Sequence, residues 1–295
     1  MTDKRPDNIS KLFELLNPCR LCPHRCGANR LAGEKGRCRT AGEIRVSSSN
    51  LHFSEEPPVS GASGSGTIFF SNCTLSCVFC QNYPISRLGH GNAISVEELT
   101  GMMLGLQGRG AHNINFVTPT HYAAHLAQAV SGARDKGLKI PILYNSSGYD
   151  DVNTLRLLEG VIDVYMPDAK YSRDDNAVKY SGAENYTEVN RAALKEMHRQ
   201  VGELKLDNRG IAQRGLIIRH LVLPGDIAGS RKVLEFIAKE ISAKTYLSLM
   251  AQYHPADRAG GYPELSRKLT KKEYGEAVKA AEELGFENGW IQEMD

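Results

Sequence analysis

Residues 71–81 read SNCTLSCVFCQ and place Cys73, Cys77 and Cys80 directly after the apolar run TIFF. A closed zinc site takes four ligands, whereas this segment supplies three. Three interpretations compete for it: a Cys-x-x-Cys redox pair, a zinc site and an iron–sulfur cluster. The redox pair leaves Cys73 unused, and nothing in the sequence fixes a fourth zinc ligand. A [4Fe–4S] cubane on three cysteines would keep one iron open for a ligand that is not protein.

Composition narrows the class of protein. The chain has 295 residues, enough for one large α/β barrel or two domains. Its net charge of +2 and its scattered basic residues do not indicate nucleic-acid binding. No apolar run approaches the roughly 20 residues of a membrane helix, and the polar N-terminus does not resemble a secretory signal. We therefore expect a cytoplasmic protein without a nucleic-acid or membrane partner.

Two regions differ in composition. Residues 1–58 form a predicted Cys-rich accessory region, and the Pro/Gly/Ser stretch 55–66 is typical of a linker. Across residues 59–295, short apolar runs suited to buried parallel strands alternate with helical patterns. The runs are 67–72, 114–119, 140–146, 162–168, 216–224 and 245–253. The alternation predicts an α/β fold, a partial (β/α)6 TIM-like barrel with a small Cys-rich N-terminal region.

Local signals place the helices. Ser95 and Thr270 each open a capping box, which predicts a helix start. Further helices are predicted at 121–137, 151–159, 185–204 and 230–242. The insertion at about 171–213 is longer than a standard crossover and reads as an irregular stretch before a helix. It is either a lid or partner-binding element, or simply a larger surface crossover.

Polar residues follow the runs at the carboxyl ends of the predicted strands, where parallel α/β folds carry their sites. These residues include Thr118, Thr120, His121, Asn145, Asp168, Lys170 and His254. Asp168 and Lys170 are two positions apart and would share one face of a strand. They would then either orient an anionic group or form a structural ion pair.

A second cysteine set lies near the N-terminus, at Cys19, Cys22, Cys26 and Cys38. All seven cysteines precede residue 81, which in a reducing compartment indicates metal or redox chemistry. Four thiolates in twenty residues can close a zinc site or hold a second iron–sulfur cluster. The sequence leaves both metals open, and His24 could replace one ligand.

The segment CTLSCVFC matches Cys-x3-Cys-x-aromatic-Cys and resembles the signature of radical S-adenosylmethionine (SAM) enzymes. The whole chain resembles an uncharacterised group similar to pyruvate formate-lyase activating enzyme. The stretches that carry this likeness are CRLCPHRCGANRLAGEKGRC, GSGTIFFSNCTLSCVFCQN, NINFVTPTHY, YNSSGY, RHLVLPG and MAQYHPA. The resemblance implies a barrel of radical SAM type and a [4Fe–4S] cluster whose open iron is chelated by SAM. One-electron cleavage of SAM would then give a 5′-deoxyadenosyl radical that takes hydrogen from a substrate.

The resemblance implies roles for several residues, but one part of the family's pattern is missing. Cys73, Cys77 and Cys80 match the cluster ligands, and Phe79 matches the aromatic residue beside cluster and adenine. Lys170 is similar to the lysine that contacts the SAM carboxylate. The remaining matches are Asp168 and Asn145, near a monovalent-cation site, and His254, near SAM. After the second strand, activating enzymes carry Gly-Gly-Glu, whereas this chain has Thr118-Pro119-Thr120. Backbone carbonyls or threonine hydroxyls would have to hold the SAM amino group here.

The resemblance favours an oxidoreductase that abstracts hydrogen from a protein, as a glycyl-radical activating enzyme does, with flavodoxin or ferredoxin as reductant. The missing Gly-Gly-Glu favours a second hypothesis, a radical SAM enzyme for a small molecule or another peptide. A third is a non-catalytic iron–sulfur electron carrier, although a carrier needs no substrate-sized mouth ringed by polar strand ends.

Overall fold

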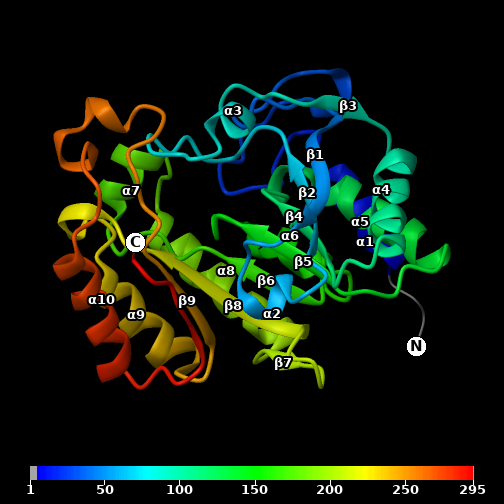
Figure 1. Ribbon diagram of the computed structural model, residues 1–295. Helices are drawn as coiled ribbons and strands as arrows, with labels where there is room; N and C mark the ends of the chain where they lie inside the picture. The colour runs from blue at the N-terminus through cyan, green and yellow to red at the C-terminus, as the bar shows by residue number, and fades with distance from the viewer. Residues whose placement is uncertain (1–4, 295) are drawn as a thin grey trace.

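The computed structural model describes residues 5–294, which form an α/β fold around a ten-stranded mixed sheet (Figure 1). The strand order is β10-β9-β8-β6-β5-β4-β2-β1-β3, with β7 paired to β8 outside this path. The strands are β1 (Ile44–His52), β2 (Ser65–Phe70), β3 (Asn92–Ile94), β4 (Ile114–Val117), β5 (Ile142–Ser146), β6 (Val164–Pro167), β7 (Lys205–Leu206), β8 (Ala212–Leu221), β9 (Tyr246–Met250) and β10 (Gly289–Ile291).

Each of the six predicted runs contains a strand. These strands, β2, β4, β5, β6, β8 and β9, are consecutive parallel neighbours, which confirms the strand predictions. The sheet continues past them in both directions. β10 adds a parallel strand to β9, and β1 and β3 add an antiparallel edge beyond β2. Because β1 lies within residues 1–58, part of the predicted accessory region belongs to the main sheet; the boundary at residue 58 and the six-unit barrel stay predictions.

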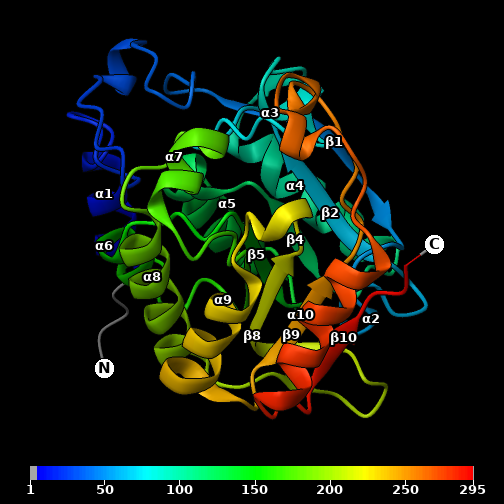
Figure 2. The same ribbon diagram turned by 90° about the vertical axis from the view of Figure 1, so that its left-hand side faces the viewer.

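Helices surround the sheet, and most of the longer ones cover its outer face, as Figures 1 and 2 show from two sides. They are α1 (Arg5–Glu14), α2 (Pro57–Ser60), α3 (Tyr83–Ser86), α4 (Val96–Gly108), α5 (Ala123–Asp135), α6 (Val152–Leu157), α7 (Asp174–Ser181), α8 (Tyr186–Val201), α9 (Ser230–Phe236) and α10 (Lys271–Glu283). Both predicted capping boxes are formed, at Ser95 and at Thr270. Short helical turns are η1 (Arg30–Ala32), η2 (Thr120–Tyr122), η3 (Pro224–Asp226), η4 (Ile237–Ser242), η5 (Ala259–Gly261) and η6 (Pro263–Leu265). Within residues 5–294, no helix combines the length and apolar character needed to cross a bilayer.

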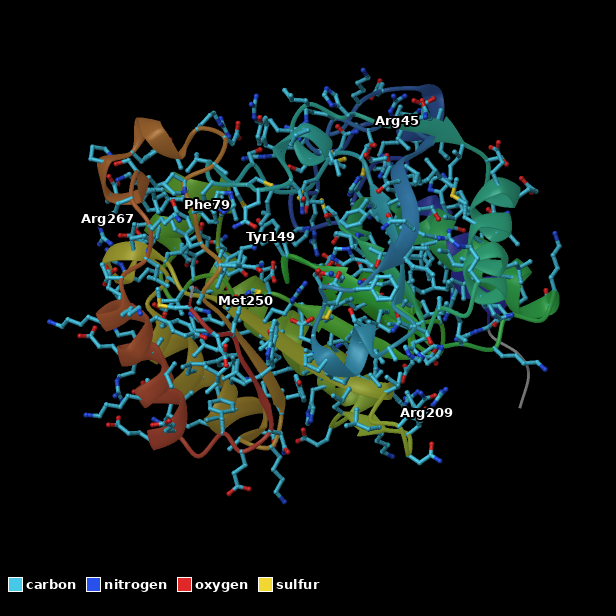
Figure 3. All side chains as sticks on the ribbon, viewed as in Figure 1. Arg45, Phe79, Tyr149, Arg209, Met250 and Arg267 are labelled. Atoms are coloured by element: carbon cyan, nitrogen blue, oxygen red, sulfur yellow. The ribbon has the colours of Figure 1, made fainter. Side chains whose placement is uncertain are left out.

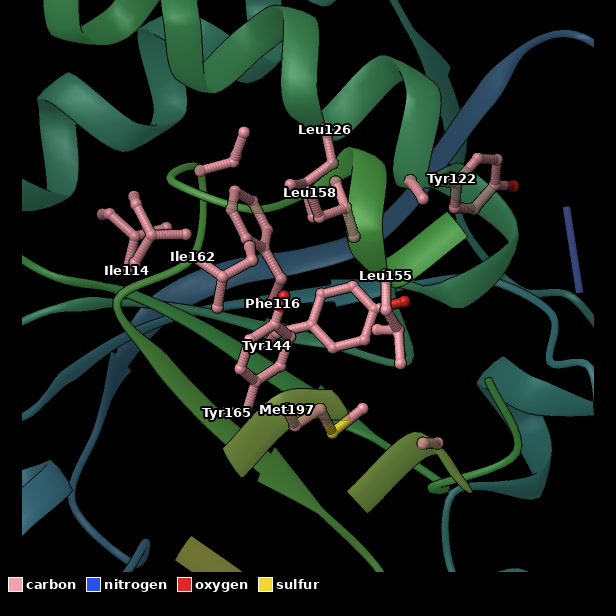
Figure 4. Close-up of a cluster of buried hydrophobic side chains, with 14 of the residues drawn as sticks. Ile114, Phe116, Tyr122, Leu126, Tyr144, Leu155, Leu158, Ile162, Tyr165 and Met197 are labelled. Carbon is pink, nitrogen blue, oxygen red and sulfur yellow. The ribbon is translucent and has the colours of Figure 1, made fainter. Parts of the chain in front are cut away.

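Alternation along the strands divides the buried side chains between two faces. Charged side chains such as Arg45, Arg209 and Arg267 lie toward the periphery in Figure 3. The main core lies between the outer face of the sheet and the helices, where Phe116, Tyr144 and other fully buried residues pack (Figure 4). A smaller core lies on the inner face and contains Leu143, Val164, Met166, Ala212, Ile217 and Val59.

Val59 shows that residues 55–66 are not a linker, so that prediction was wrong. Its side chain is fully buried among inner-face residues, and the short helix α2 that carries it plugs the amino-terminal end of the sheet. Ser65 and Gly66 already belong to β2. Pro, Gly and Ser suit this plug because it turns sharply and approaches other backbone closely. A Cβ at Gly66, for instance, would lie 2.6 Å from the Asn113 carbonyl.

The insertion at 171–213 contains two helices, where one was predicted. α8 packs on the outer face as the crossover between β6 and β8. α7, which was predicted as irregular, lies beside the loop that carries the three cysteines. Its end accepts hydrogen bonds from Ser76 N to Ser181 O at 2.9 Å and from Val78 N to Tyr180 O at 2.8 Å. The insertion therefore holds the cysteine loop in place.

Candidate functional site

A cavity of about 400 Å³ opens at the carboxyl ends of the parallel strands. It brings together side chains that the sequence assigned to one site. The predicted residues that line it are Cys73, Cys77, Phe79, Cys80, Thr118, Asn145, Asp168 and Lys170. They come from the ends of four neighbouring strands, so the structure brings these side chains together at this edge, while their roles stay predictions.

Each of the three thiols has a hydrogen-bond partner. Leu75 N donates to Cys73 Sγ at 3.3 Å, and Ser181 Oγ of α7 donates to Cys77 Sγ at 3.0 Å. Cys80 Sγ lies 3.1 Å from Ser86 Oγ. The loop packs against a second apolar cluster, which includes Leu75, Phe79 and Tyr149. Phe79 and Tyr149, both buried, are labelled in Figure 3.

Burial dominates the chemistry of these thiols. It raises the pKa of Cys73 to about 12, and it raises the pKa of Cys77 against the opposing effect of the Lys170 ammonium. Without a metal both groups are neutral thiols at neutral pH, whereas a coordinating thiol is deprotonated by the metal's charge.

The donor set fits a cubane cluster. A [4Fe–4S] cluster binds one thiolate at each iron, so its protein ligands need not meet at one ion. Among residues 5–294, no group of three or more His, Cys, Asp or Glu side chains is arranged to hold a single metal ion, and this applies to the N-terminal cysteines as well. Three partly buried thiols at the mouth of a cavity suit such a cluster, with the cavity as the approach to its open iron.

Asp168 and Lys170 share one face, as their spacing predicted, and both line the cavity. Lys170 Nζ lies 2.6 Å from Asp168 Oδ2, with each side chain about one-fifth exposed. Burial works to lower the pKa of Lys170, but the Asp168 carboxylate outweighs it and raises that pKa. Tyr186 OH donates to the Asp168 carbonyl at 3.2 Å and fixes the backbone between them. The ion pair is thus structural and also presents a charged ammonium to the cavity.

The hydroxyls of Thr118 and Thr120 lie in different environments. Thr118 lines the cavity and adopts φ +61°, a strained conformation for a β-branched residue. Thr120 is buried, and its Oγ1 donates to Asp150 Oδ1 at 2.7 Å. Asp150 also accepts from Tyr144 and Ser146, and burial raises its pKa. Thr120 does not line the cavity and its hydroxyl hydrogen goes to Asp150, so the cofactor contact expected of this residue stays a prediction.

The two histidines expected near the mouth do not line the cavity. His254 is exposed, and its Nδ1 lies 3.2 Å from Gln81 Nε2. His121 is buried, and its Nε2 donates to the Ser71 carbonyl at 2.9 Å. Burial lowers the pKa of His121 to about 3, so it is a neutral support beneath the cysteine loop.

Other parts of the cavity wall were not assigned to the site from the sequence. They are His52, Ser54, Glu55, Phe69, Leu75, Gln81, Asn82, Ser86, Val117, Ser146, Ser147, Arg219, Leu221, Met250, Gln252 and Trp290. Arg219 and Gln252 stand at strand ends that the sequence directed toward one mouth, but neither residue received a role from the sequence. Glu55 could not, because it lies in the segment that was interpreted as a linker.

Relatives of the chain place it in a family. The sequence matches no known protein-family model. The uncharacterized protein MJ0674 of Methanocaldococcus jannaschii is 31% identical over 279 residues, which cover 91% of this chain and 75% of that protein. The chain belongs to the MJ0674 family. Because that relative is itself uncharacterized, membership in the family does not name a reaction.

Solved structures relate the fold of this MJ0674-family chain to known enzymes. The FeFe-hydrogenase maturase HydG from Carboxydothermus hydrogenoformans gives a TM-score of 0.53 at 13% identity, over 78% of this chain and 53% of HydG. Methylornithine synthase (PylB) gives 0.51 at 14% identity, over 76% of this chain and 63% of PylB. Both are radical SAM enzymes, so the chain has the fold of that superfamily. The chain matches only about half of HydG.

The N-terminal cysteines of this family member lie close to one another. Cys19, Cys22 and Cys38 are buried and Cys26 is exposed. A Cβ at Gly36 would lie 3.0 Å from the Cys26 sulfur and 3.7 Å from the Cys38 sulfur. Burial raises the pKa of Cys22 to about 12, and the neighbouring Cys38 and Cys19 add to the effect. The four thiols form one group, whose metal stays a proposal.

The Cys-rich region contacts the surroundings of Cys73, Cys77 and Cys80. His24 Nε2 donates at 2.8 Å to the carbonyl of Thr74, which follows Cys73. Two arginines of the same region donate hydrogen bonds beside Cys77 and Cys80. Arg37 donates at 3.1 Å to Gly182 O, next to the serine that contacts Cys77. Arg39 donates at 2.5 Å to Ser86 O, the residue that contacts Cys80. Figure 2 shows this N-terminal segment beside α7.

Proposed function

We propose that the protein is a radical SAM enzyme whose cluster is held by Cys73, Cys77 and Cys80. The observation that carries the proposal is the three-cysteine loop at the mouth of a cavity, on the fold of radical SAM enzymes. When bound, the cluster and SAM supply one-electron reductive cleavage of SAM and hydrogen-atom abstraction from a substrate.

The chain's own residues bind and orient in this proposal. Lys170, kept charged by Asp168, suits the carboxylate of SAM, since an ammonium donates only. Phe79 is nearly buried and gives an apolar wall beside the cysteines that excludes water. Thr118 and its strained backbone stand where the related enzymes carry Gly-Gly-Glu, and we assign it to the SAM amino group. Asn145 and Asp168 complete the polar side of the cavity.

For the substrate, we propose a protein, as for a glycyl-radical activating enzyme, with flavodoxin or ferredoxin as electron donor. The resemblance of the chain's motifs to activating enzymes supports it. A second candidate, a small molecule, is favoured by the cavity of about 400 Å³ and by the absence of the Gly-Gly-Glu carboxylate. A substrate-sized cavity argues against a pure electron carrier. We also propose a zinc or iron–sulfur centre at Cys19, Cys22, Cys26 and Cys38.

Anaerobic reconstitution tests the proposal. The full chain is loaded with iron and sulfide, reduced, and given SAM, and 5′-deoxyadenosine is measured. We expect product from the wild type and none from Cys77→Ala, while Cys22→Ala keeps activity if the N-terminal centre is structural. A reduced, cluster-loaded protein that forms no 5′-deoxyadenosine would favour the electron carrier.

A further inference from the structure

The floor of the cavity holds a buried ion cluster formed by Glu55, Glu56 and Arg219. Arg219 Nε donates to Glu56 Oε1 at 2.7 Å, and its Nη2 donates to Glu55 Oε2 at 2.9 Å. The side chains of Glu55 and Glu56 are 7% and 0% exposed, and that of Arg219 is 15% exposed. These groups are more than 160 residues apart in sequence and meet only because the plug segment folds into the sheet.

Strand periodicity fixes where this cluster lies. Ile217 and Arg219 share the inner face of β8, and Leu143 and Asn145 share the inner face of β5. Ile217 and Leu143 pack against Val59 of the plug, whereas Arg219 and Asn145, one pleat further on, line the cavity. The cluster is therefore a polar floor between an apolar plug below and the cysteine loop above.

The charges of the floor do not balance. Two carboxylates face one guanidinium, which leaves one negative charge, while the neighbouring Asp168 and Lys170 cancel each other. A buried charge is costly unless it is paired. Burial works to lower the pKa of Arg219, but Glu56 and Glu55 outweigh it and hold that pKa above its ordinary value.

Hydrogen bonding shows the same deficit of donors. Asn115 Nδ2 donates to Glu55 Oε1 at 3.0 Å, but the other atom of that amide, Asn115 Oδ1, is buried and accepts nothing within residues 5–294. Glu56 Oε2 is likewise buried without a donor in the described part of the chain. Asn115 and Glu56 do not line the cavity, so these two acceptors add to the negative character behind Glu55, which does line it. A wall of this kind favours a group that donates only and is positively charged.

We propose that this floor is a subsite for a cationic nitrogen of the substrate, a protonated amine or a guanidinium, received by the Glu55 carboxylate. The proposal rests on the function above, since it assigns the chemistry of the substrate for the same cavity. A lysine or arginine side chain of a protein and a free amine share this chemistry. Of the two carboxylates in this ion cluster, only that of Glu55 lines the cavity. Glu55 is therefore the group that would contact the cationic nitrogen.

Trp290 provides the test, because it is the chain's single tryptophan and lines the same cavity. Its fluorescence in the full chain is titrated with n-butylammonium, 1-butanol and butyrate, which differ in charge but share one chain length. A fourth probe is acetyl-Gly-Lys-Gly-amide. We expect n-butylammonium to bind tightest of the first three. Tighter binding of the peptide than of butylammonium would identify a protein as source, and weaker binding a free amine; both support the subsite.

Two isosteric variants complete the test. Glu55→Gln should weaken butylammonium binding roughly tenfold or more, since a hydrogen bond to a charged group contributes about 1.5–3 kcal/mol. Glu43→Gln, an exposed glutamate paired with Arg45 outside the cavity, should leave it unchanged. Circular dichroism confirms that both variants fold. Butyrate binding as tightly as butylammonium, or a folded Glu55→Gln variant with unchanged preference, would overturn the subsite. Because the titration needs no SAM cleavage, failure of the proposed function is seen separately.

Discussion

Replacing Arg39 by Ala should loosen the cysteine loop without unfolding the protein. Arg39 donates a part-buried, charge-assisted hydrogen bond at 2.5 Å to the carbonyl of Ser86 in α3. Such a bond contributes about 1.5–3 kcal/mol. This corresponds to an opening equilibrium roughly 10-fold to 150-fold more populated, since about 1.4 kcal/mol is a factor of ten. Arg37 bonds to Gly182 at 3.1 Å on the exposed surface, so its removal should have a much smaller effect.

Hydrogen exchange of the full chain measures this opening. In Arg39→Ala we expect faster exchange at amides tied to the segment around Ser86, such as Asn72 N, which donates to Ile85 O at 3.0 Å. Arg20→Ala is the matched control, because Arg20 is an exposed arginine of the same Cys-rich region. The reasoning is refuted if Arg39→Ala leaves protection of the loop unchanged, or if Arg20→Ala lowers it equally.

The remaining predictions concern individual charges. Lys170→Met should keep the iron content and weaken SAM binding roughly tenfold or more in equilibrium dialysis; unchanged affinity would contradict the assigned role. Arg219→Gln leaves Glu55 and Glu56 buried without their cation and should lower the free energy of unfolding in urea by about 3–5 kcal/mol; a loss below about 1 kcal/mol would show the cluster to be well solvated. Because burial holds the pKa of His121 at about 3 against 6.5 in the unfolded chain, the unfolded state binds the proton first. Stability should therefore fall as pH drops from about 6.5 toward 3, and His121→Gln should flatten that slope; an equal slope in the variant would exclude this cause.

The sequence was informative where one local signal decides the structure. Continuous apolar runs predicted the six central strands, and the capping boxes at Ser95 and Thr270 predicted helix starts to the residue. The cysteine loop followed from the motif itself. In each case the physical cause lies within a few residues of the element, so no distant contact was needed.

The sequence was uninformative where contacts between residues far apart in the chain decide the structure. The stretch 55–66 has the composition of a linker, yet Val59 is buried and Glu55 reaches Arg219 across 164 residues. No local pattern distinguishes a buried plug from a flexible connection when both are rich in Pro, Gly and Ser. Likewise, Thr118 and Thr120 look equivalent in sequence, and only the left-handed backbone of the first and the buried Asp150 beside the second separate their roles.

The most direct test of the central claim is the electron paramagnetic resonance spectrum of the reduced protein, recorded before and after addition of SAM. The account predicts a [4Fe–4S]+ signal that changes when SAM occupies the open iron, and no SAM-responsive signal in Cys73→Ala. A reduced cluster whose spectrum is unchanged by saturating SAM, or a SAM response that survives in Cys73→Ala, would contradict it.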